Sequence, residues 1–392
     1  SFYPLISAVT QTLRRIPDRD GQTPYEKLVG FLGQFAINAD HAPIFAQVLS
    51  IALPDGVVVK ETPDAVKKTI FEDWFDLVNR MSETRPLLLV LEDAHWIDPS
   101  TRELVMKLVD WAPQHRILAL VTRRPAQGFD SESAARFQDL TLDRLNPDHN
   151  REMVNKVVGD VLLPQELVDL IVRKTDGVPL YIEELTKTLL ESDMLQQREG
   201  RYELTGPLPS LAIPTSLQDS LMSRLDRLST IKDVVQVAAT IGRRFSLKLL
   251  EDVTNYGENL LQDALRRLVE AELVYPVDDA VEHTYEFKHA LVQDAAYQSL
   301  LRSTRRKYHD QIAKTLETGS GNPAEARPEI LAYHYTEAMK IEKAIHYWLE
   351  AGKRAAETSS HLEATAHLEK GLQLVRALPA GKERDEREFQ LQ

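Results

Sequence analysis

Two adjacent carboxylates, Glu92 and Asp93, are the side chains of this sequence best suited to chemistry. They directly follow the apolar run Leu87–Leu91, which is typical of a strand buried on both faces of a parallel sheet. Open α/β sheets place their ligands at this carboxyl end of the strands. One acid can hold Mg²⁺, directly or through its waters, and the other can orient or deprotonate an attacking water. The pattern therefore predicts a Walker B strand.

The simpler interpretation is that the two acids only end a buried strand and that Asp98 caps the next helix. Successive side chains of a strand point to opposite faces, so the two acids would have different roles at a nucleotide site. The nucleotide interpretation is favoured because strand, acid pair and a helix beginning at Asp98-Pro99 follow one another in the order that the motif requires.

A second apolar run, Ile117–Val121, predicts a parallel neighbour of the first strand. It ends in Thr122 and Arg123, and an arginine at that edge could reach a terminal phosphate. The alternative is a solvated strand end. A third short strand is expected at Asp139–Leu142.

Two further segments carry candidate binding residues. Gly177 and Pro179 lie in a short interruption between helical patterns, where a glycine suits a helix end and a proline a helix start, so a simple turn explains them. His289 follows the predicted strand Thr284–Phe287. A lone histidine there is more often packed in the structure than bound to a ligand.

Composition limits the function classes. The 392 residues are 43% hydrophobic and 27% charged, as in ordinary globular proteins, and they contain no cysteine. The formal charge of −13 argues against a nucleic-acid-binding surface in this stretch. No apolar run is long enough to span a membrane and the N-terminal residues do not resemble a signal peptide, so a cytoplasmic location is expected.

The hydrophobic pattern predicts an α/β core that contains the Walker B strand, followed by helical regions. We expect the core at residues 1–146 and a helical lid with a short hairpin at 147–212. A winged helix and the helices after it are expected at 213–318, and tetratricopeptide-like helical repeats at 324–392.

Four stretches carry a resemblance to a known family: LLLVLEDAHWIDPST, LALVTRR, DGVPLYIEELTKTLL and EFKHALVQDAAYQSLLRSTRRKYHDQIAKTLE. In this order they resemble the signal-transduction ATPases with numerous domains. The chain looks most like the ATPase and tetratricopeptide part of bacterial proteins that carry a class III adenylate/guanylate cyclase domain. The resemblance extends over essentially the whole chain.

The resemblance implies roles for individual residues. Glu92 takes the position of the Mg²⁺-side acid and Asp93 that of the catalytic acid, although the family's usual order begins with aspartate and the two roles stay open. Arg123 matches the sensor arginine. Pro179, in the same Gly-Val-Pro turn as Gly177, matches the proline that packs on adenine.

His289 matches the histidine of a Met-His-Asp-like motif that contacts the β-phosphate. Lys288 and Ala290 flank it here, so the aspartate of that motif is absent.

No segment of the sequence fits G-x-x-x-x-G-K-[ST], the loop that holds the phosphates. The family carries this loop a few tens of residues before the position matched by Ser1, so the chain resembles a fragment that starts after it. The family's central strand would be missing too. The resemblance therefore implies a truncated core of the P-loop ATPase type, with an incomplete parallel sheet in which one edge of Ile117–Val121 lacks a strand partner.

These features together predict a regulatory module that binds ATP or ADP with Mg²⁺ and controls an attached output domain. By resemblance the output is a cyclase, and the C-terminal helices take a protein or effector. Slow ATP hydrolysis is expected by resemblance. One alternative is the sensor region of a LuxR-type transcription regulator, with its DNA-binding domain beyond Gln392. Another is a tetratricopeptide scaffold with a vestigial ATPase site.

Overall fold

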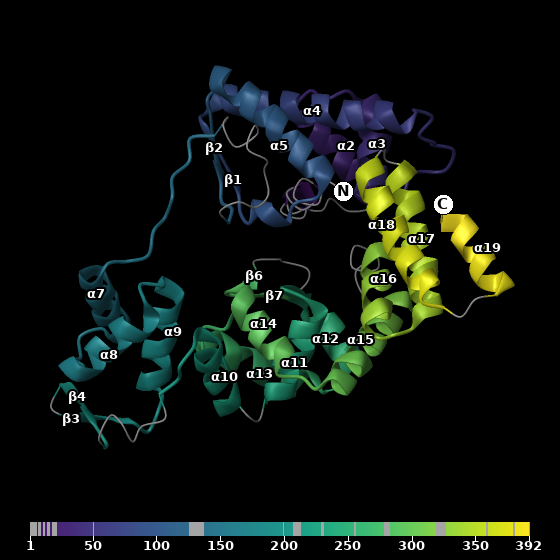
Figure 1. The fold of residues 1–392 in the computed structure, drawn as a ribbon. Helices are drawn as coiled ribbons and strands as arrows, with labels where there is room; N and C mark the ends of the chain where they lie inside the picture. Colours follow the sequence, from purple (N-terminus) through teal and green to yellow (C-terminus); the bar gives the residue numbers. More distant parts are fainter. Residues whose placement is uncertain are drawn as a thin grey trace. The chain divides into compact units, whose positions relative to one another are not determined.

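The protein is mostly helical and contains three small sheets in its described part (Figure 1). A computed structural model describes all residues except 1–5, 7–8, 11, 14–15, 18–21, 50, 125–136, 199, 207–212, 229–230, 255, 278–282, 319–326, 358–359, 379–380 and 392. The chain forms two compact units. One comprises Ser1–Asp139 and His309–Gln392, and the other comprises Leu140–Val277 and His283–Tyr308.

The first unit opens with helices whose starts follow from local sequence. Thr23 and Thr62 each precede a proline at the first helical position, and each side chain accepts a backbone N–H of the first turn. Thr23 also forms a capping box with Glu26. The helices are α2 (Pro24–Gln34), α3 (Ala42–Val48) and α4 (Pro63–Thr84), with a 3₁₀ turn η1 (Ala39–His41) before α3.

The predicted strand pair of this unit is confirmed. β1 (Leu87–Leu91) and β2 (Ile117–Val121) pair in parallel, with Leu91 opposite Val121 at their carboxyl ends. The chain crosses between them through η2 (Ala94–Trp96), α5 (Pro99–Trp111) and η3 (Ala112–Gln114). Asp98 caps α5 as expected, because its Oδ1 accepts the N–H of Thr101 at 2.9 Å.

The expectation that these strands are buried on both faces is wrong. Burial alternates along both strands, and one face of the pair is exposed. Its four apolar side chains are 51–66% exposed, namely Leu88, Val90, Leu118 and Leu120. The opposite face is partly covered. Near the strand ends, Leu91 and Val121 pack against the small cluster of Ala94 and Val105. An apolar run indicates that a strand favours burial, but whether each face is buried depends on which segments cover it.

The expected third strand at Asp139–Leu142 does not form. Leu140 and Leu142 are 86% and 88% exposed, and the segment has no strand partner among the described residues. A strand needs a neighbouring strand for its hydrogen bonds, and an isolated extended segment gains none. The described part of this sheet consists of β1 and β2, in agreement with the expectation of an incomplete sheet.

The second unit begins with a helical region. Three helices, α7 (Pro147–Val158), α8 (Gln165–Thr175) and α9 (Pro179–Leu190), bury one core that includes Ile171, Ile182 and Leu185 at 0% exposure. The predicted hairpin follows as β3 (Leu195–Arg198) and β4 (Arg201–Leu204), which pair antiparallel. Together these elements position the start of α9, which carries Pro179.

The rest of the second unit surrounds a three-stranded sheet of order β5-β7-β6. The strands are β5 (Arg244–Ser246), β6 (Val274–Val277) and β7 (Thr284–Phe287). The helices are α10 (Leu217–Arg227), α11 (Lys232–Ile241), α12 (Leu247–Thr254), α13 (Glu258–Glu270) and α14 (Ala290–Gln298). Phe245 and Phe287 from adjacent strands are buried with ring centroids 5.6 Å apart. The strand predicted at Thr284–Phe287 is confirmed as β7. The sequence also predicts a strand at Leu273–Val277, which the structure contains from Val274 as β6, and the acidic turn Asp278-Asp279 between the two strands lies outside the described residues.

The C-terminal part is helical, as predicted. It contains α15 (Arg302–Glu317), α16 (Pro328–Glu337), α17 (Ile341–Glu357), α18 (His361–Arg376) and α19 (Lys382–Leu391). Figure 1 shows α16, α17 and α18 side by side. A Cβ at Gly352 of α17 would lie 2.5 Å from Leu368 of α18, so glycine allows these helices to pack closely. The predicted break at Gly319–Pro323 lies outside the described residues.

Candidate functional site

The acid pair lies where β1 turns into η2. Glu92 is exposed, and Asp93 adopts left-handed backbone angles of φ 54° and ψ 42°. The backbone N–H of Asp93 donates to Thr122 Oγ1 at 3.0 Å, and the N–H of Ala94 donates to the carbonyl of Thr122 at 2.8 Å. The end of β2 therefore fixes the turn that carries the acids. Thr122 was not recognised from the sequence as part of this arrangement.

The left-handed conformation of Asp93 is uncommon for a residue other than glycine. Aspartate and asparagine tolerate it better than most residues, at a cost of about 1–2 kcal/mol. Here the backbone turns sharply at the end of the strand, so that the side chains of Glu92 and Asp93 are not presented as in a continuing strand. Residues held in such conformations concentrate at functional sites, which makes Asp93 a candidate on structural grounds as well.

Arg123 follows β2 at the same edge of the sheet and is engaged by an acid. Its Nη2 donates to both carboxylate oxygens of Asp139, at 3.0 and 2.8 Å. The arginine side chain is 18% exposed and the aspartate 58%. A phosphate that approached Arg123 would therefore compete with Asp139 for the guanidinium. This ion pair is not predictable from the sequence, where Asp139 is expected to begin a strand.

The backbone conformation and close packing at position 177 require a glycine. It has φ +73°, and a Cβ on it would lie 2.3 Å from the carbonyl oxygen of Leu145. The carbonyl of Gly177 also accepts the N–H of Leu145 at 2.9 Å. Only glycine fits here without displacing the backbone of the neighbouring segment. The turn interpretation therefore accounts for Gly177 by itself, while Pro179 begins α9 and is exposed.

His289 occupies the N-cap position of α14 without forming a side-chain cap. Its Nε2 is buried and has no hydrogen-bond partner in the described part of the chain. Burial lowers the pKa of His289, with a smaller opposing effect of the Glu183 carboxylate. A neutral imidazole with one unsatisfied ring nitrogen can still donate or accept one hydrogen bond, and a buried polar atom without a partner costs about 1–3 kcal/mol. A bound group with oxygen atoms would satisfy it.

The candidate residues divide between the two units. Glu92, Asp93 and Arg123 lie in the first, where the β1–β2 pairing brings them to one sheet edge. Gly177, Pro179 and His289 lie in the second. Among the described residues, no group of three or more acidic or histidine side chains forms a metal cage. Mg²⁺ at nucleotide sites is usually held by one or two carboxylates together with phosphate oxygens and water, which Glu92 and Asp93 would fit.

Comparison with known proteins gives distant similarities. No protein-family model matches the chain. An uncharacterized protein of Rhizobium meliloti is 27% identical over 321 residues, which are 80% of this chain and 30% of that protein. Adenylate cyclase type 10 of Rattus norvegicus is 21% identical over 331 residues, 72% of this chain and 20% of the cyclase. The chain thus spans less than a third of the length of these relatives.

Among solved structures, the chain aligns with a signal transduction ATPase with numerous domains from Pyrococcus horikoshii, with a TM-score of 0.47. That protein carries a tetratricopeptide repeat sensor. The alignment has 12% identity and covers 89% of this chain and 49% of that one. In the described ranges, no helix has the length and apolar character needed to cross a bilayer.

Proposed function

We propose that this chain is the switch region of a regulatory ATPase, which binds ATP or ADP with Mg²⁺ and controls an output domain of a longer protein. In this proposal Glu92 and Asp93 hold the metal and activate the attacking water, Arg123 contacts the terminal phosphate, and Pro179 packs on the base. His289 contacts the β-phosphate with its neutral imidazole.

The observation that carries the proposal is the register of β1 and β2. Leu91 opposite Val121 brings the acid pair and Arg123 to one carboxyl edge of a parallel pair, the place where open α/β sheets bind their ligands. The left-handed turn at Asp93, tied to Thr122, gives that edge a defined shape. In the second unit, support comes from the buried, unpartnered Nε2 of His289.

The output is proposed to be a nucleotide cyclase. The support is the similarity to adenylate cyclase type 10, which is distant but extends over 72% of this chain. The packed helices α16 to α18 would take the protein or effector that sets the switch. A ligand shifts the populations of two states of a switch only if it binds one state better than the other, and ATP and ADP can differ in this way.

Nucleotide binding by the full-length protein tests the proposal. We expect MgATP and MgADP to bind, and we expect His289→Ala to release ADP at least about fivefold faster, because it loses a phosphate contact. His149→Ala, which changes an exposed histidine of α7, is the control and should leave ADP release unchanged. Absence of nucleotide binding by the full-length protein would refute the proposal, and equal release from both variants and the parent would return His289 to a structural role.

A further inference from the structure

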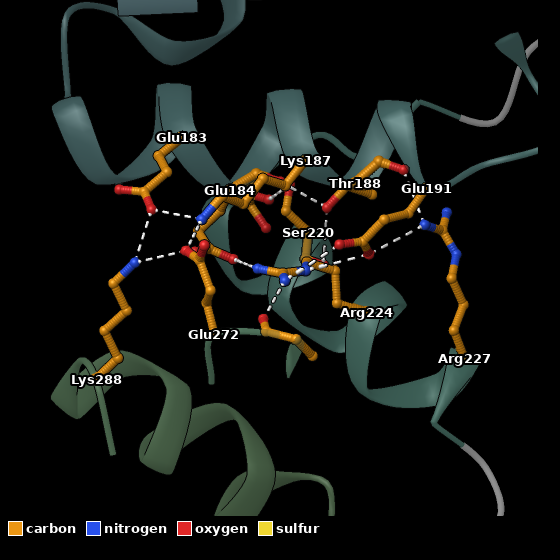
Figure 2. Close-up of polar contacts among 12 residues, drawn as sticks. Glu183, Glu184, Lys187, Thr188, Glu191, Ser220, Arg224, Arg227, Glu272 and Lys288 are labelled. Atoms are coloured by element: carbon orange, nitrogen blue, oxygen red, sulfur yellow. Dashed lines mark hydrogen bonds and ion pairs between the residues drawn. The ribbon is translucent and has the colours of Figure 1, made fainter. Parts of the chain in front are cut away.

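Four charged side chains in the second unit form a closed ring in which every cation contacts both anions (Figure 2). Glu183 and Lys187 lie one turn apart on α9. Glu272 follows α13, and Lys288 lies between β7 and α14. The ring therefore joins α9 to two segments that flank the three-stranded sheet, across 105 residues of sequence between Glu183 and Lys288.

The distances are those of direct hydrogen-bonded ion pairs. Lys288 Nζ lies 3.0 Å from Glu183 Oε1 and 2.9 Å from Glu272 Oε2. Lys187 Nζ lies 2.7 Å from the same oxygen of Glu183 and also contacts Glu272 Oε2. One carboxylate oxygen of Glu183 and one of Glu272 thus each contact both lysine ammonium groups. A network of this kind is worth more than isolated surface pairs, which typically contribute less than about 1 kcal/mol.

A second charged group lies beside the ring but differs from it in burial. The side chains of Arg224 on α10 and Glu184 on α9 are 3% and 2% exposed and are joined at 2.6 Å. Arg224 Nη2 also donates to the carbonyl of Ala271 at 2.6 Å, next to Glu272. Separating this buried contact would leave a charge without a partner in the interior, so we expect it to stay closed when the ring opens. The ring, with side chains 19–56% exposed, is reached by solvent and salt.

Contacts within the ring favour the charged forms of Glu183, Glu272 and Lys288. Hydrogen bonds from Lys187 and Lys288 lower the pKa of Glu272 to about 2. Burial alone would raise the pKa of Glu183, but hydrogen bonds from the same two lysines lower it. For Lys288, burial opposes the charged form while the hydrogen bonds to Glu272 and Glu183 raise its pKa. Protons therefore do not open this contact near neutrality, whereas salt or a competing charged group can.

We propose that the ring of Glu183, Lys187, Glu272 and Lys288 is an electrostatic latch that holds α9 against the β7–α14 turn and opens when the switch changes state. The buried Arg224 contact keeps α9, α10 and the Ala271 end of α13 together, so that opening is confined to Lys288 and the β7–α14 turn that carries it.

The position of Lys288 couples the latch to His289. Lys288 immediately precedes the histidine, and its backbone N–H donates to the carbonyl of Leu273 at 3.0 Å. Its side chain contacts Glu183, one turn after the start of α9 at Pro179. The latch therefore fixes the distance between the His289 turn and the N-terminal turn of α9. Its effect on nucleotide release rests on the proposed function, whereas its effect on the distance between these elements does not.

The latch is tested by measuring that distance directly. The chain has no cysteine, so spin labels at Glu166→Cys on α8 and Asp294→Cys on α14 are unique in this region. We expect one narrow distance distribution in the parent at low salt and a second, longer population in Lys288→Met. Lys288→Arg, which keeps the charge, should restore the single population. Lys156→Met is the matched control, because Lys156 pairs with Glu152 of its own helix at 2.8 Å.

Salt gives an independent measurement. Raising the ionic strength to about 1 M, where the Debye length falls to about 3 Å, should increase the longer population in the parent but change Lys288→Met little. Unchanged distances in Lys288→Met with retained folding would overturn the latch, whatever the protein binds. If the distances change and nucleotide binds, Lys288→Met should also release ADP at least about fivefold faster. If the distances change and no nucleotide binds, the latch stands and the proposed function fails.

Discussion

At the scale of single residues, the turn at Asp93 decides which substitution can test its chemistry. Alanine would remove the carboxylate and also place a poorly suited residue at φ 54°, whereas asparagine tolerates left-handed angles. Asp93→Asn should therefore keep the fold and leave Glu92 in place for the metal. In the full-length protein we expect MgATP binding to persist while hydrolysis falls by about 10²-fold, as is typical of losing a general base. The measurement is phosphate release together with nucleotide titration.

Asp55→Asn is the control for this experiment, because Asp55 is an exposed carboxylate in a turn of the same unit. It should change neither binding nor hydrolysis. Unaltered hydrolysis in Asp93→Asn would assign the base to another group, with Glu92 the first candidate.

A second residue-scale prediction separates two causes of glycine dependence. Gly177→Ala places a Cβ 2.3 Å from the Leu145 carbonyl at φ +73°, whereas Gly159→Ala, at φ +82°, meets no atom within 4 Å. Gly159→Ala should destabilise by about 1–3 kcal/mol, the cost of forcing alanine into the backbone angles φ 82° and ψ −138°, which glycine adopts readily. Gly177→Ala should cost at least about 1–3 kcal/mol more, because the backbone must shift. Chemical denaturation of both variants checks this, and equal losses would contradict the close approach.

At the scale of elements, the α9–α10 contact depends on a buried ion pair. Arg224→Met leaves Glu184, 1% exposed, without its cation, and we expect a loss of about 3–5 kcal/mol in the free energy of unfolding. The double variant Arg224→Met with Glu184→Leu removes both charges and should recover much of this loss. Arg266→Met, at an arginine 59% exposed, is the control and should cost less than about 1 kcal/mol. A double variant no better than the single would contradict this account.

Local rules in the sequence predicted many element boundaries of this fold. Asp98 before Pro99 marked the start of α5, and the same signal, a threonine before a proline, stands at the starts of α2 and α4, because capping depends on residues within one turn. The pairing of β1 with β2 followed from two apolar runs with ionic ends. In the candidate site, the same reasoning placed Glu92, Asp93 and Arg123 at one sheet edge.

Features set by contacts between distant segments were not predictable in this way. An apolar run could not show that the Leu88 and Leu118 side of the sheet is exposed, since exposure depends on which segments cover it. The pairing of Arg123 with Asp139 and the contact of Lys288 with Glu183 join residues 16 and 105 positions apart. The sequence shows each charged residue, but the fold determines which of them form ion pairs.

At the scale of the whole molecule, buried histidines should set the first step of acid destabilisation. His309 and His334 are 0% and 2% exposed, with their Nδ1 atoms 2.8 Å apart. Burial, aided by the nearby His309, lowers the pKa of His334 to about 3. The unfolded chain, with a histidine pKa near 6.5, then binds more protons than the folded state between about pH 6.5 and 3. Stability should therefore be greatest above pH 6.5 and decline as the pH falls through this window.

The carboxylates add a second, later step. Glu317 accepts hydrogen bonds from Tyr335, Lys343 and Tyr347 at 2.5–2.8 Å. Burial would raise its pKa, but these donors lower it to about 2. Its stabilising effect is present above the unfolded value near 4.5 and is lost as the pH falls toward 2. Urea midpoints measured from pH 8 to 3 check both steps: His334→Gln should flatten the curve between pH 6.5 and 5, while an unchanged slope there would exclude this histidine.

The exposed face of the β1–β2 pair should affect how the protein behaves in solution. This exposed apolar surface is one on which other molecules can adsorb, and it is made by Leu88, Val90, Leu118 and Leu120. A preparation of these 392 residues should brighten a dye such as anilinonaphthalene sulfonate, scatter light increasingly with concentration and adhere to hydrophobic resins. Replacing Leu118 with lysine should weaken all three behaviours at once. In a longer version of the protein, the dye signal would report how much of this surface the rest of the polypeptide shields.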